Sequence, residues 1–136
     1  MPAHNINYPW MSYYENYDYF EQRMSEHNRV SGIDKINPSL YHIELVNGNV
    51  IKTFICECYS FDVAEYFEAT QELGELNAVV INSIWCGYSL EVKHLCRNRQ
   101  VGIYKIREFM AALNMERYWQ YLTDYEKEQF KEKGWL

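Results

Sequence analysis

Two cysteines, Cys56 and Cys58, lie two residues apart within a mostly apolar segment. On a β-strand this spacing places both thiols on one face, where two thiolates are able to ligate a zinc ion. The other groups that could complete a four-ligand site are Cys86, Cys96, His42 and His94. None of these has the paired short spacing typical of zinc sites. We therefore expect reduced thiols in the core and no cofactor, with a zinc site as the alternative interpretation.

A carboxylate stands two residues before a lysine at Glu91 and Lys93. This spacing is similar to one half of a signature of metal-dependent nucleases, in which the carboxylate holds Mg²⁺ and the lysine steadies the attacking water. The signature also needs an aspartate on the preceding strand, where this chain has Asn77 and Asn82, with Glu75 at the strand entrance. Glu91 equally suits the first turn of a helix, where negative charge is favoured. A nuclease-like domain using Glu91 and Lys93 is kept as the second alternative function.

A histidine and a cysteine also stand close together, at His94 and Cys96. Two residues apart on a helix, their side chains splay and do not form the hydrogen-bonded pair that nucleophilic catalysis needs. The six glycines are scattered at expected turns and helix ends, with no glycine-rich loop to cradle a phosphate. These observations predict a protein that is not an enzyme.

Positive charge is concentrated in one segment of an acidic chain. Residues 93–107 carry five of the 13 Lys and Arg and no acid, although the whole chain has a net charge of −6. A cationic surface on an acidic protein attracts an acidic partner or a phosphate backbone. Aromatic residues make up 17% of the chain, and tyrosine is common at interface hot spots. The predicted partner-binding residues are Lys93, Arg97, Arg99, Tyr104, Lys105, Arg107, Tyr13 and Tyr17.

Length and composition indicate one domain. The 136 residues include 48% hydrophobic residues, enough for a single compact core. We expect one globular domain over 1–136, with 1–10 as a loose N-terminal arm. The chain shows neither a signal peptide nor an apolar run long enough to span a membrane, which favours a cytoplasmic protein that does not bind membranes.

The periodicity of the sequence predicts an α+β fold. Asn47-Gly48 lies between two β-branched runs and predicts a hairpin at about 39–59, which a buried strand at about 78–85 would join. The expected sheet is therefore small, three-stranded, and antiparallel or mixed. It packs with four to six helices, and the C-terminal half of the chain is helical.

Capping signals place the expected helices. Ser12 with Glu15 predicts a helix over about 12–29, ended by Ser31 and Gly32, and Asp62 with Glu65 predicts another over about 62–73, closed by Gly74. Ser89 begins a third helix, and apolar residues at helical spacing from 103 to 113 indicate a fourth. Thr123 with Glu126 starts a terminal helix that Lys133-Gly134 ends, so that Trp135 packs back on it.

The two helices expected over 89–109 partly fit a helix-turn-helix, in which Tyr104, Lys105 and Arg107 would face DNA. The connecting residues lack the usual order of small residue, glycine and apolar residue, so the motif would be degenerate. A nucleic-acid-binding regulator is the first alternative function. The structural alternative is a solvated helix face whose positive charges balance the acidic helices.

A small acidic α+β domain with many aromatic residues and no catalytic signature is similar in type to bacterial immunity proteins, antitoxins and phage-encoded inhibitors. This likeness implies a non-enzymatic cytosolic protein that binds and occludes a macromolecular partner. We expect a protein partner, held by Tyr and Trp anchors with charged residues steering its approach. An acidic partner would use the basic segment, and a basic partner would use the tyrosine-rich first helix.

Overall fold

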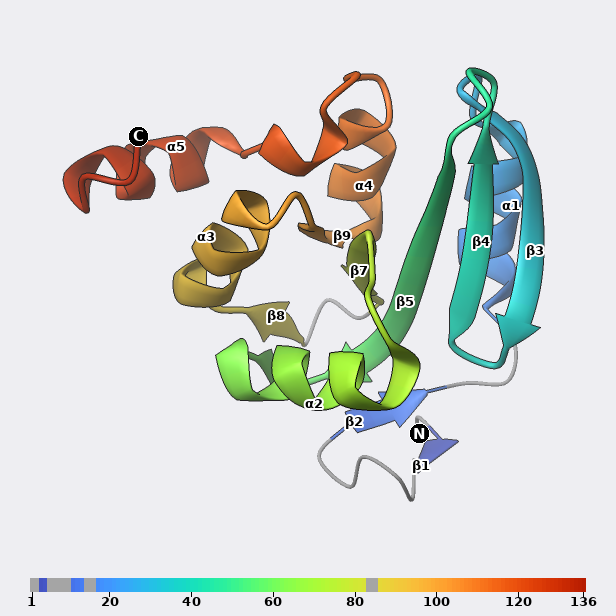
Figure 1. Cartoon of the computed structure of the whole chain (residues 1–136), viewed down its shortest axis with the longest axis horizontal. Helices are drawn as coiled ribbons and strands as arrows, with labels where there is room; N and C mark the ends of the chain where they lie inside the picture. The colour runs from blue at the N-terminus through green and yellow to red at the C-terminus, as the bar shows by residue number, and fades with distance from the viewer. Residues whose placement is uncertain (1–2, 5–10, 14–16, 83–85) are drawn as a thin grey trace.

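The structure is a computed structural model that describes residues 3–4, 11–13, 17–82 and 86–136. Its centre is a mixed sheet with the strand order β3-β4-β5-β7-β9. These strands are β3 (Val30–Asn37), β4 (Leu40–Leu45), β5 (Val50–Cys58), β7 (Ala78–Ile81) and β9 (Gly102–Lys105). Strand β4 runs antiparallel to both neighbours, whereas β5, β7 and β9 are parallel to one another (Figure 1).

Smaller elements surround this sheet. Strands β1 (Ala3–His4) and β2 (Met11–Tyr13) form an antiparallel ribbon that pairs with the end of β5. A separate parallel pair consists of β6 (Ser60–Phe61) and β8 (Gly87–Tyr88). The helices are α1 (Asp18–Glu26), α2 (Val63–Leu73), α3 (Leu90–Asn98), α4 (Ile106–Ala112) and α5 (Asp124–Glu132), with a 3₁₀ turn, η1, at Tyr118–Gln120.

The predicted hairpin is confirmed. Strands β4 and β5 pair antiparallel, and the chain reverses at Asn47-Gly48. Gly48 has φ +91°, a conformation that glycine adopts without steric cost, and the Asn47 side chain accepts a hydrogen bond from the Asn49 N–H. The turn therefore sets the register that brings Ile43 opposite Ile51.

Two crossovers of the β-α-β type complete the parallel part of the sheet, in which β5 leads through α2 to β7 and β7 leads through α3 to β9. Helix α2 begins with the predicted capping box of Asp62 and Glu65 and ends at Gly74, which has φ +80°. Ser89 caps α3 by accepting a hydrogen bond from the Val92 N–H. The helices predicted at these positions, and a third strand beside the hairpin, are confirmed.

The sheet has a hydrophobic core on each face. Helices α2 and α3 cover one face, where Phe54, Cys56 and Cys58 of β5 are buried. Helices α1 and α4 cover the other, where Ile51 and Ile55 of the same strand are buried. Buried residues of β5 thus enter opposite cores in alternation, which confirms that the two cysteines are small core residues on one face.

The predicted first helix is wrong at both ends. Helix α1 spans only Asp18–Glu26, and Ser12, expected as its cap, instead lies in β2. Glu15 and most of the 1–10 arm lie outside the described residues. Ser31 and Gly32 do not end a helix but belong to β3, an edge strand that the sequence reasoning missed.

The sheet is also larger than the three strands predicted, because β3 and β9 flank it. Residues 102–105, expected within a helix, pair in parallel with β7, and the helix that follows starts only at Ile106. Strand β7 ends at Ile81 rather than near 85, and residues 83–85 lie outside the described part. None of the helices in the described part is long and apolar enough to cross a membrane.

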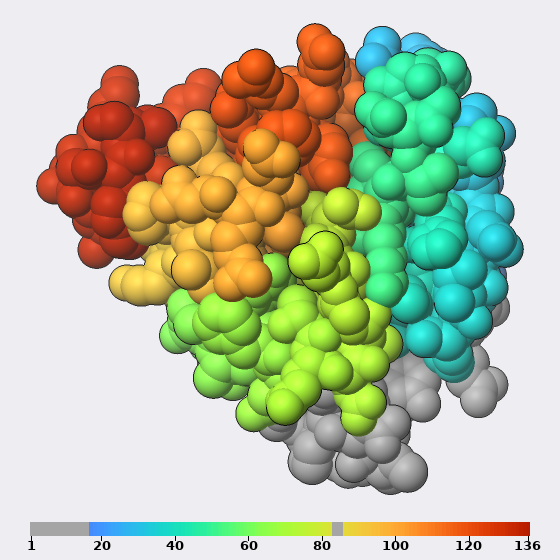
Figure 2. All heavy atoms as spheres, in the orientation of Figure 1, coloured from blue at the N-terminus to red at the C-terminus, as the bar shows by residue number. Residues whose placement is uncertain are grey.

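The C-terminal helix begins and ends as predicted. Thr123 and Glu126 form the capping box of α5, and Gly134 has φ +74°. The backbone N–H of Trp135 donates to Phe130 O at 2.8 Å. The indole ring of Trp135 stacks on the ring of His94 in α3, with 4.2 Å between the ring centres. Helix α5 thus lies beside α3 at one end of the molecule (Figure 2).

Candidate functional site

Several residues predicted to face a partner are buried. The exposed fraction is 1% for Lys93, 0% for Tyr104 and 3% for Tyr17. Lys93 donates from Nζ to Ile103 O at 2.5 Å, and the Tyr104 hydroxyl donates to Tyr118 O. The side chain of Tyr13 lies outside the described part. The expected cationic surface is therefore incomplete, because the side chains of Lys93 and Tyr104 point into the protein.

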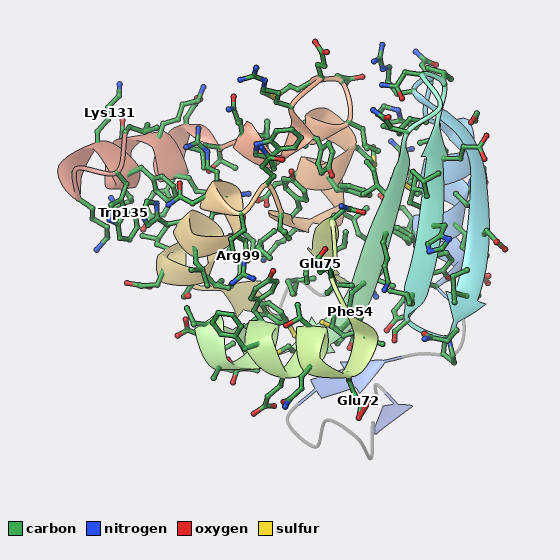
Figure 3. The ribbon with its side chains drawn as sticks, in the orientation of Figure 1. Phe54, Glu72, Glu75, Arg99, Lys131 and Trp135 are labelled. Atoms are coloured by element: carbon green, nitrogen blue, oxygen red, sulfur yellow. The ribbon has the colours of Figure 1, made fainter. Side chains whose placement is uncertain are left out.

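The remaining cations are divided between the two ends of β9. Arg97 donates to Gln120 O, and Arg99 lies over the rings of Tyr66 and Phe67 at 5.7 and 5.4 Å (Figure 3). Both precede β9, whereas Lys105 ends β9 and Arg107 follows it. The basic segment therefore has no common surface, and Lys105 and Arg107 form a pair of their own.

This pair lines a cleft of about 630 Å³ at the carboxyl ends of β7 and β9. Ligands of α/β proteins typically bind outside the carboxyl ends of parallel strands, because the loops there leave a crevice. Its polar and aromatic lining residues are Tyr19, Asn82, Lys105, Arg107, Glu108, Tyr121 and Thr123. We call this cavity the β7–β9 cleft.

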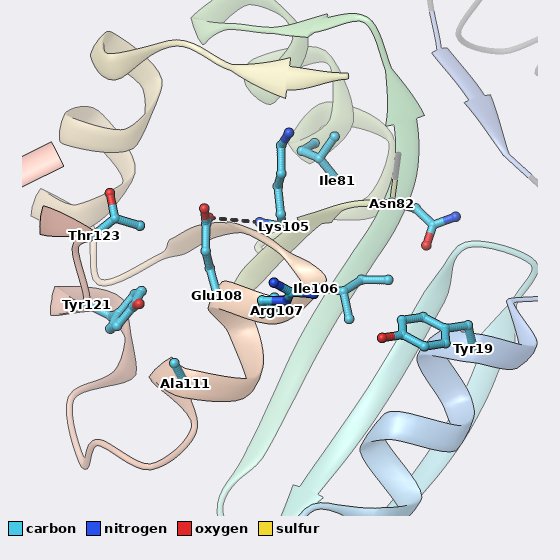
Figure 4. A pocket seen from close by; sticks show the side chains of 10 residues that line it. All are labelled: Tyr19, Ile81, Asn82, Lys105, Ile106, Arg107, Glu108, Ala111, Tyr121 and Thr123. Carbon is cyan, nitrogen blue, oxygen red and sulfur yellow. Dashed lines mark hydrogen bonds between the residues drawn. The ribbon is translucent and has the colours of Figure 1, made fainter. Parts of the chain in front are cut away.

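Five different elements place these side chains. Asn82 follows β7 and Lys105 ends β9, while Arg107 belongs to the first turn of α4. Tyr19 comes from α1, and Tyr121 follows η1. In the close view the two tyrosines stand on opposite sides of the cleft with Arg107 between them (Figure 4). Tyr19 is 61% exposed, so its ring is available to a partner.

The charges of the β7–β9 cleft are unbalanced. Glu108 Oε1 already accepts two hydrogen bonds, from the backbone N–H of Lys105 at 3.0 Å and from the Tyr88 hydroxyl at 2.6 Å. Within the described residues, the side chains of Lys105 and Arg107 have neither an ion pair nor a hydrogen bond. The cleft thus presents two cationic groups whose charge is open to an anionic partner.

Beside this cleft lies a polar cluster of Tyr88, Lys93, Glu108 and Glu126, in which Lys93 and Glu126 are buried. The Tyr88 hydroxyl contacts Glu108 Oε1 and Glu126 Oε2 at 2.6 and 2.7 Å. Burial lowers the pKa of Lys93 to about 8, although the carboxylates of Glu126 and Glu108 oppose this shift. Burial, followed by the same two carboxylates, raises the pKa of Tyr88. The Tyr88 hydroxyl thus links Glu108 of α4 to Glu126 of α5, while Lys93 of α3 bonds to Ile103 O.

The lowered pKa of Lys93 predicts a pH dependence of stability. The unfolded state holds the Lys93 proton up to pH about 10.5, but the folded state releases it near pH 8, so stability rises with pH between these values. We expect wild type to gain about 1 kcal/mol over Lys93→Met between pH 7 and pH 9. Urea denaturation at both pH values measures this difference.

The comparison with Lys93→Met also controls for the cysteines. Burial raises the pKa of Cys58 and of Cys96 to about 12, so both thiols lower stability as the pH rises above 9. The loss from Cys58 is common to both proteins and cancels in the difference, whereas Lys93 itself lowers the pKa of Cys96. Parallel stability curves for the two proteins would show that Lys93 is not the titrating group.

The other chemical patterns in the sequence do not assemble into sites. Glu91 is exposed on α3 while Lys93 is buried, so the two do not share a face as the nuclease signature requires. His94 stacks on Trp135, whereas Cys96 is buried against α2 and β9. Among the described residues, no three His, Cys, Asp or Glu side chains are grouped to hold a metal ion.

Of the predicted residues whose side chains are described, Lys105 and Arg107 line the β7–β9 cleft and the others do not. Sequence reasoning missed Tyr19, Asn82 and Tyr121, which come from distant segments. Asn82 directly follows strand β7. Recognising that β7 pairs in parallel with its neighbours would have identified Asn82 as a candidate, because ligands bind at the carboxyl ends of parallel strands. Comparisons with protein-family models, with curated proteins and with solved structures found no match to this chain.

Proposed function

We propose that this is a non-enzymatic binding protein that docks an acidic macromolecular partner in the β7–β9 cleft. The observation that carries this proposal is the pair of Lys105 and Arg107, which line a cleft of about 630 Å³ and whose side chains form no ion pair within the described part of the chain. Two cations at the rim steer an acidic partner into place and penalise a basic one. Occlusion of the partner's own site would follow from this docking.

Aromatic side chains supply the apolar part of the contact. Tyr19 and Tyr121 flank the cations, and tyrosine buries a large area on binding at a low cost in side-chain entropy. The fold positions Tyr121 through η1, whose Tyr118 carbonyl accepts the Tyr104 hydroxyl bond. The cleft therefore combines aromatic anchors with steering charges, as expected of a protein interface.

A protein partner suits these charges better than a nucleic acid does. Affinity for a phosphate backbone grows with the number of phosphates that adjacent Lys and Arg neutralise. Here the cations of the basic segment are split between the two ends of β9, so that two of the five line the cleft.

Affinity capture from the source organism tests the proposal. Wild type is compared with Lys105→Ala/Arg107→Ala, and with Lys127→Ala/Lys131→Ala as a control that removes the same charge from exposed positions on α5. We expect a protein partner that wild type and the control retain and that the cleft variant loses. Equal capture by the cleft variant, or a partner released by nuclease treatment, would contradict the proposal.

A further inference from the structure

A second cavity adjoins the β7–β9 cleft. It has a volume of about 410 Å³ and is lined by Gly87, Tyr88, Leu90, Tyr125 and Glu126 together with three residues of the first cavity. The shared residues are Lys105, Glu108 and Thr123. A ligand that passes over these three shared residues therefore contacts both cavities.

The aromatic residues at the outer parts of the two cavities belong to different helices. Tyr19 of α1 lines only the first cavity, and Tyr125 of α5 lines only the second. Their exposed fractions are 61% and 64%, so both rings are accessible. A compact group fills one cavity, whereas only an extended segment contacts both tyrosines.

Hydrogen-bonding groups of both kinds lie between these tyrosines. Asn82 donates from Nδ2 to the carboxylate of Glu57. Within the described residues, Asn82 Oδ1 and Glu108 Oε2 accept no hydrogen bond. Thr123 Oγ1 accepts from the Glu126 N–H, which leaves its own proton to donate. The cavities thus offer both hydrogen-bond acceptors and a hydrogen-bond donor. A peptide backbone matches both, because each peptide unit has one N–H to donate and one C=O to accept.

We infer that the occupant of the two cavities is an extended acidic peptide segment of the partner, an inference that rests on the proposed function. Its carboxylates meet Lys105 and Arg107, and its backbone bonds to Asn82, Glu108 and Thr123. A single-stranded nucleic acid has no backbone N–H to donate to the two open oxygens, Asn82 Oδ1 and Glu108 Oε2, whereas each peptide unit supplies one. The peptide is therefore the favoured occupant.

Fluorescence anisotropy with a labelled peptide of alternating alanine and glutamate tests this inference. We expect salt-sensitive binding that Lys105→Ala weakens about tenfold, with no binding of the matching alanine-lysine peptide or of a thymidine oligonucleotide. Tyr19→Ala and Tyr125→Ala should each weaken binding about fivefold, because an extended ligand contacts both rings. Tyr59→Ala, at a position 81% exposed and outside both cavities, is the control.

Each other outcome overturns the inference. No peptide binding, or binding that Tyr125→Ala leaves unchanged, shows that no extended segment lies along both cavities. Oligonucleotide binding lost in the same variants shows a nucleic acid in its place. If the captured partner still depends on Lys105 and Arg107 while the peptide does not bind, the proposed function stands and only the extended peptide is wrong.

Discussion

Replacing Gly102 with alanine is expected to destabilise the protein by about 3 kcal/mol, the upper end of the usual cost of overpacking a core. Gly102 and Tyr104 lie two residues apart on β9 and therefore face the same side of the sheet. A Cβ added at Gly102 would overlap the phenol ring and hydroxyl of Tyr104. The Gly102→Ala protein has to move this ring.

The surroundings of Tyr104 resist such a movement. Its ring is fully buried and stacks on Phe109 at 5.5 Å between ring centres, with Lys93 Nζ over it at 4.3 Å. Its hydroxyl is bonded to Tyr118 O, which ties β9 to η1. Urea denaturation of Gly102→Ala measures the cost. Gly32→Ala is the control, because nothing lies within 4 Å of a Cβ there, and equal losses for the two variants would contradict this packing.

Replacing Phe130 with alanine is expected to cost about 3–5 kcal/mol, the range for truncating a buried phenylalanine. Phe130 is the fully buried apolar residue of α5, and its ring meets those of His94 and Trp135 edge-on at 5.7 and 5.1 Å. Without Phe130, the C-terminal segment is held to α3 by the stacked pair of His94 and Trp135 and to β8 by the hydrogen bond between Tyr88 and Glu126.

Two measurements check the Phe130→Ala prediction. Urea denaturation gives the loss of stability, and limited proteolysis shows whether the C-terminal helix is cleaved early. Tyr125→Ala is the control on the same helix, because Tyr125 is 64% exposed and its removal should leave stability nearly unchanged. A Phe130→Ala protein as stable as this control would show that α5 does not belong to the cooperative core.

The parts of the fold that sequence reasoning predicted correctly depend on signals between near neighbours. Asn47-Gly48 specifies its turn by backbone conformation, and Asp62 with Glu65 specifies a helix start by two reciprocal hydrogen bonds. The same holds for Thr123 with Glu126. The residues in these interactions are at most three positions apart, so the residues that form the sequence pattern are also the ones in contact in the structure.

The wrong predictions concern elements that depend on distant partners. Strand β3 is an exposed edge strand with irregular register and charged residues, Asp34 and Lys35, so it has no clear period of two. Strand β9 has only four residues, and its Ile103 lies three positions before Ile106 of α4, which imitates a helical spacing across the junction. Pairing with β7, 24 residues earlier in register, decides the outcome.

The candidate site was predictable only in part for the same reason. Lys105 and Arg107 are close in sequence and were expected at the surface, but Tyr19 reaches the cleft through the packing of α1 against α4. Lys93 was expected to face solvent because lysine is rarely buried without partners. Lys93 donates a hydrogen bond to Ile103 O and interacts electrostatically with the carboxylates of Glu108 and Glu126. No local sequence pattern predicts the interaction with Glu126.

The most direct test of docking in the β7–β9 cleft is the affinity of the purified, captured partner for three proteins at physiological salt. These are wild type, Lys105→Ala/Arg107→Ala and Lys127→Ala/Lys131→Ala. We predict that the cleft variant binds about 30-fold more weakly with unchanged stability, whereas the α5 control binds within about twofold of wild type. Equal affinities for the cleft variant and wild type would contradict the central claim.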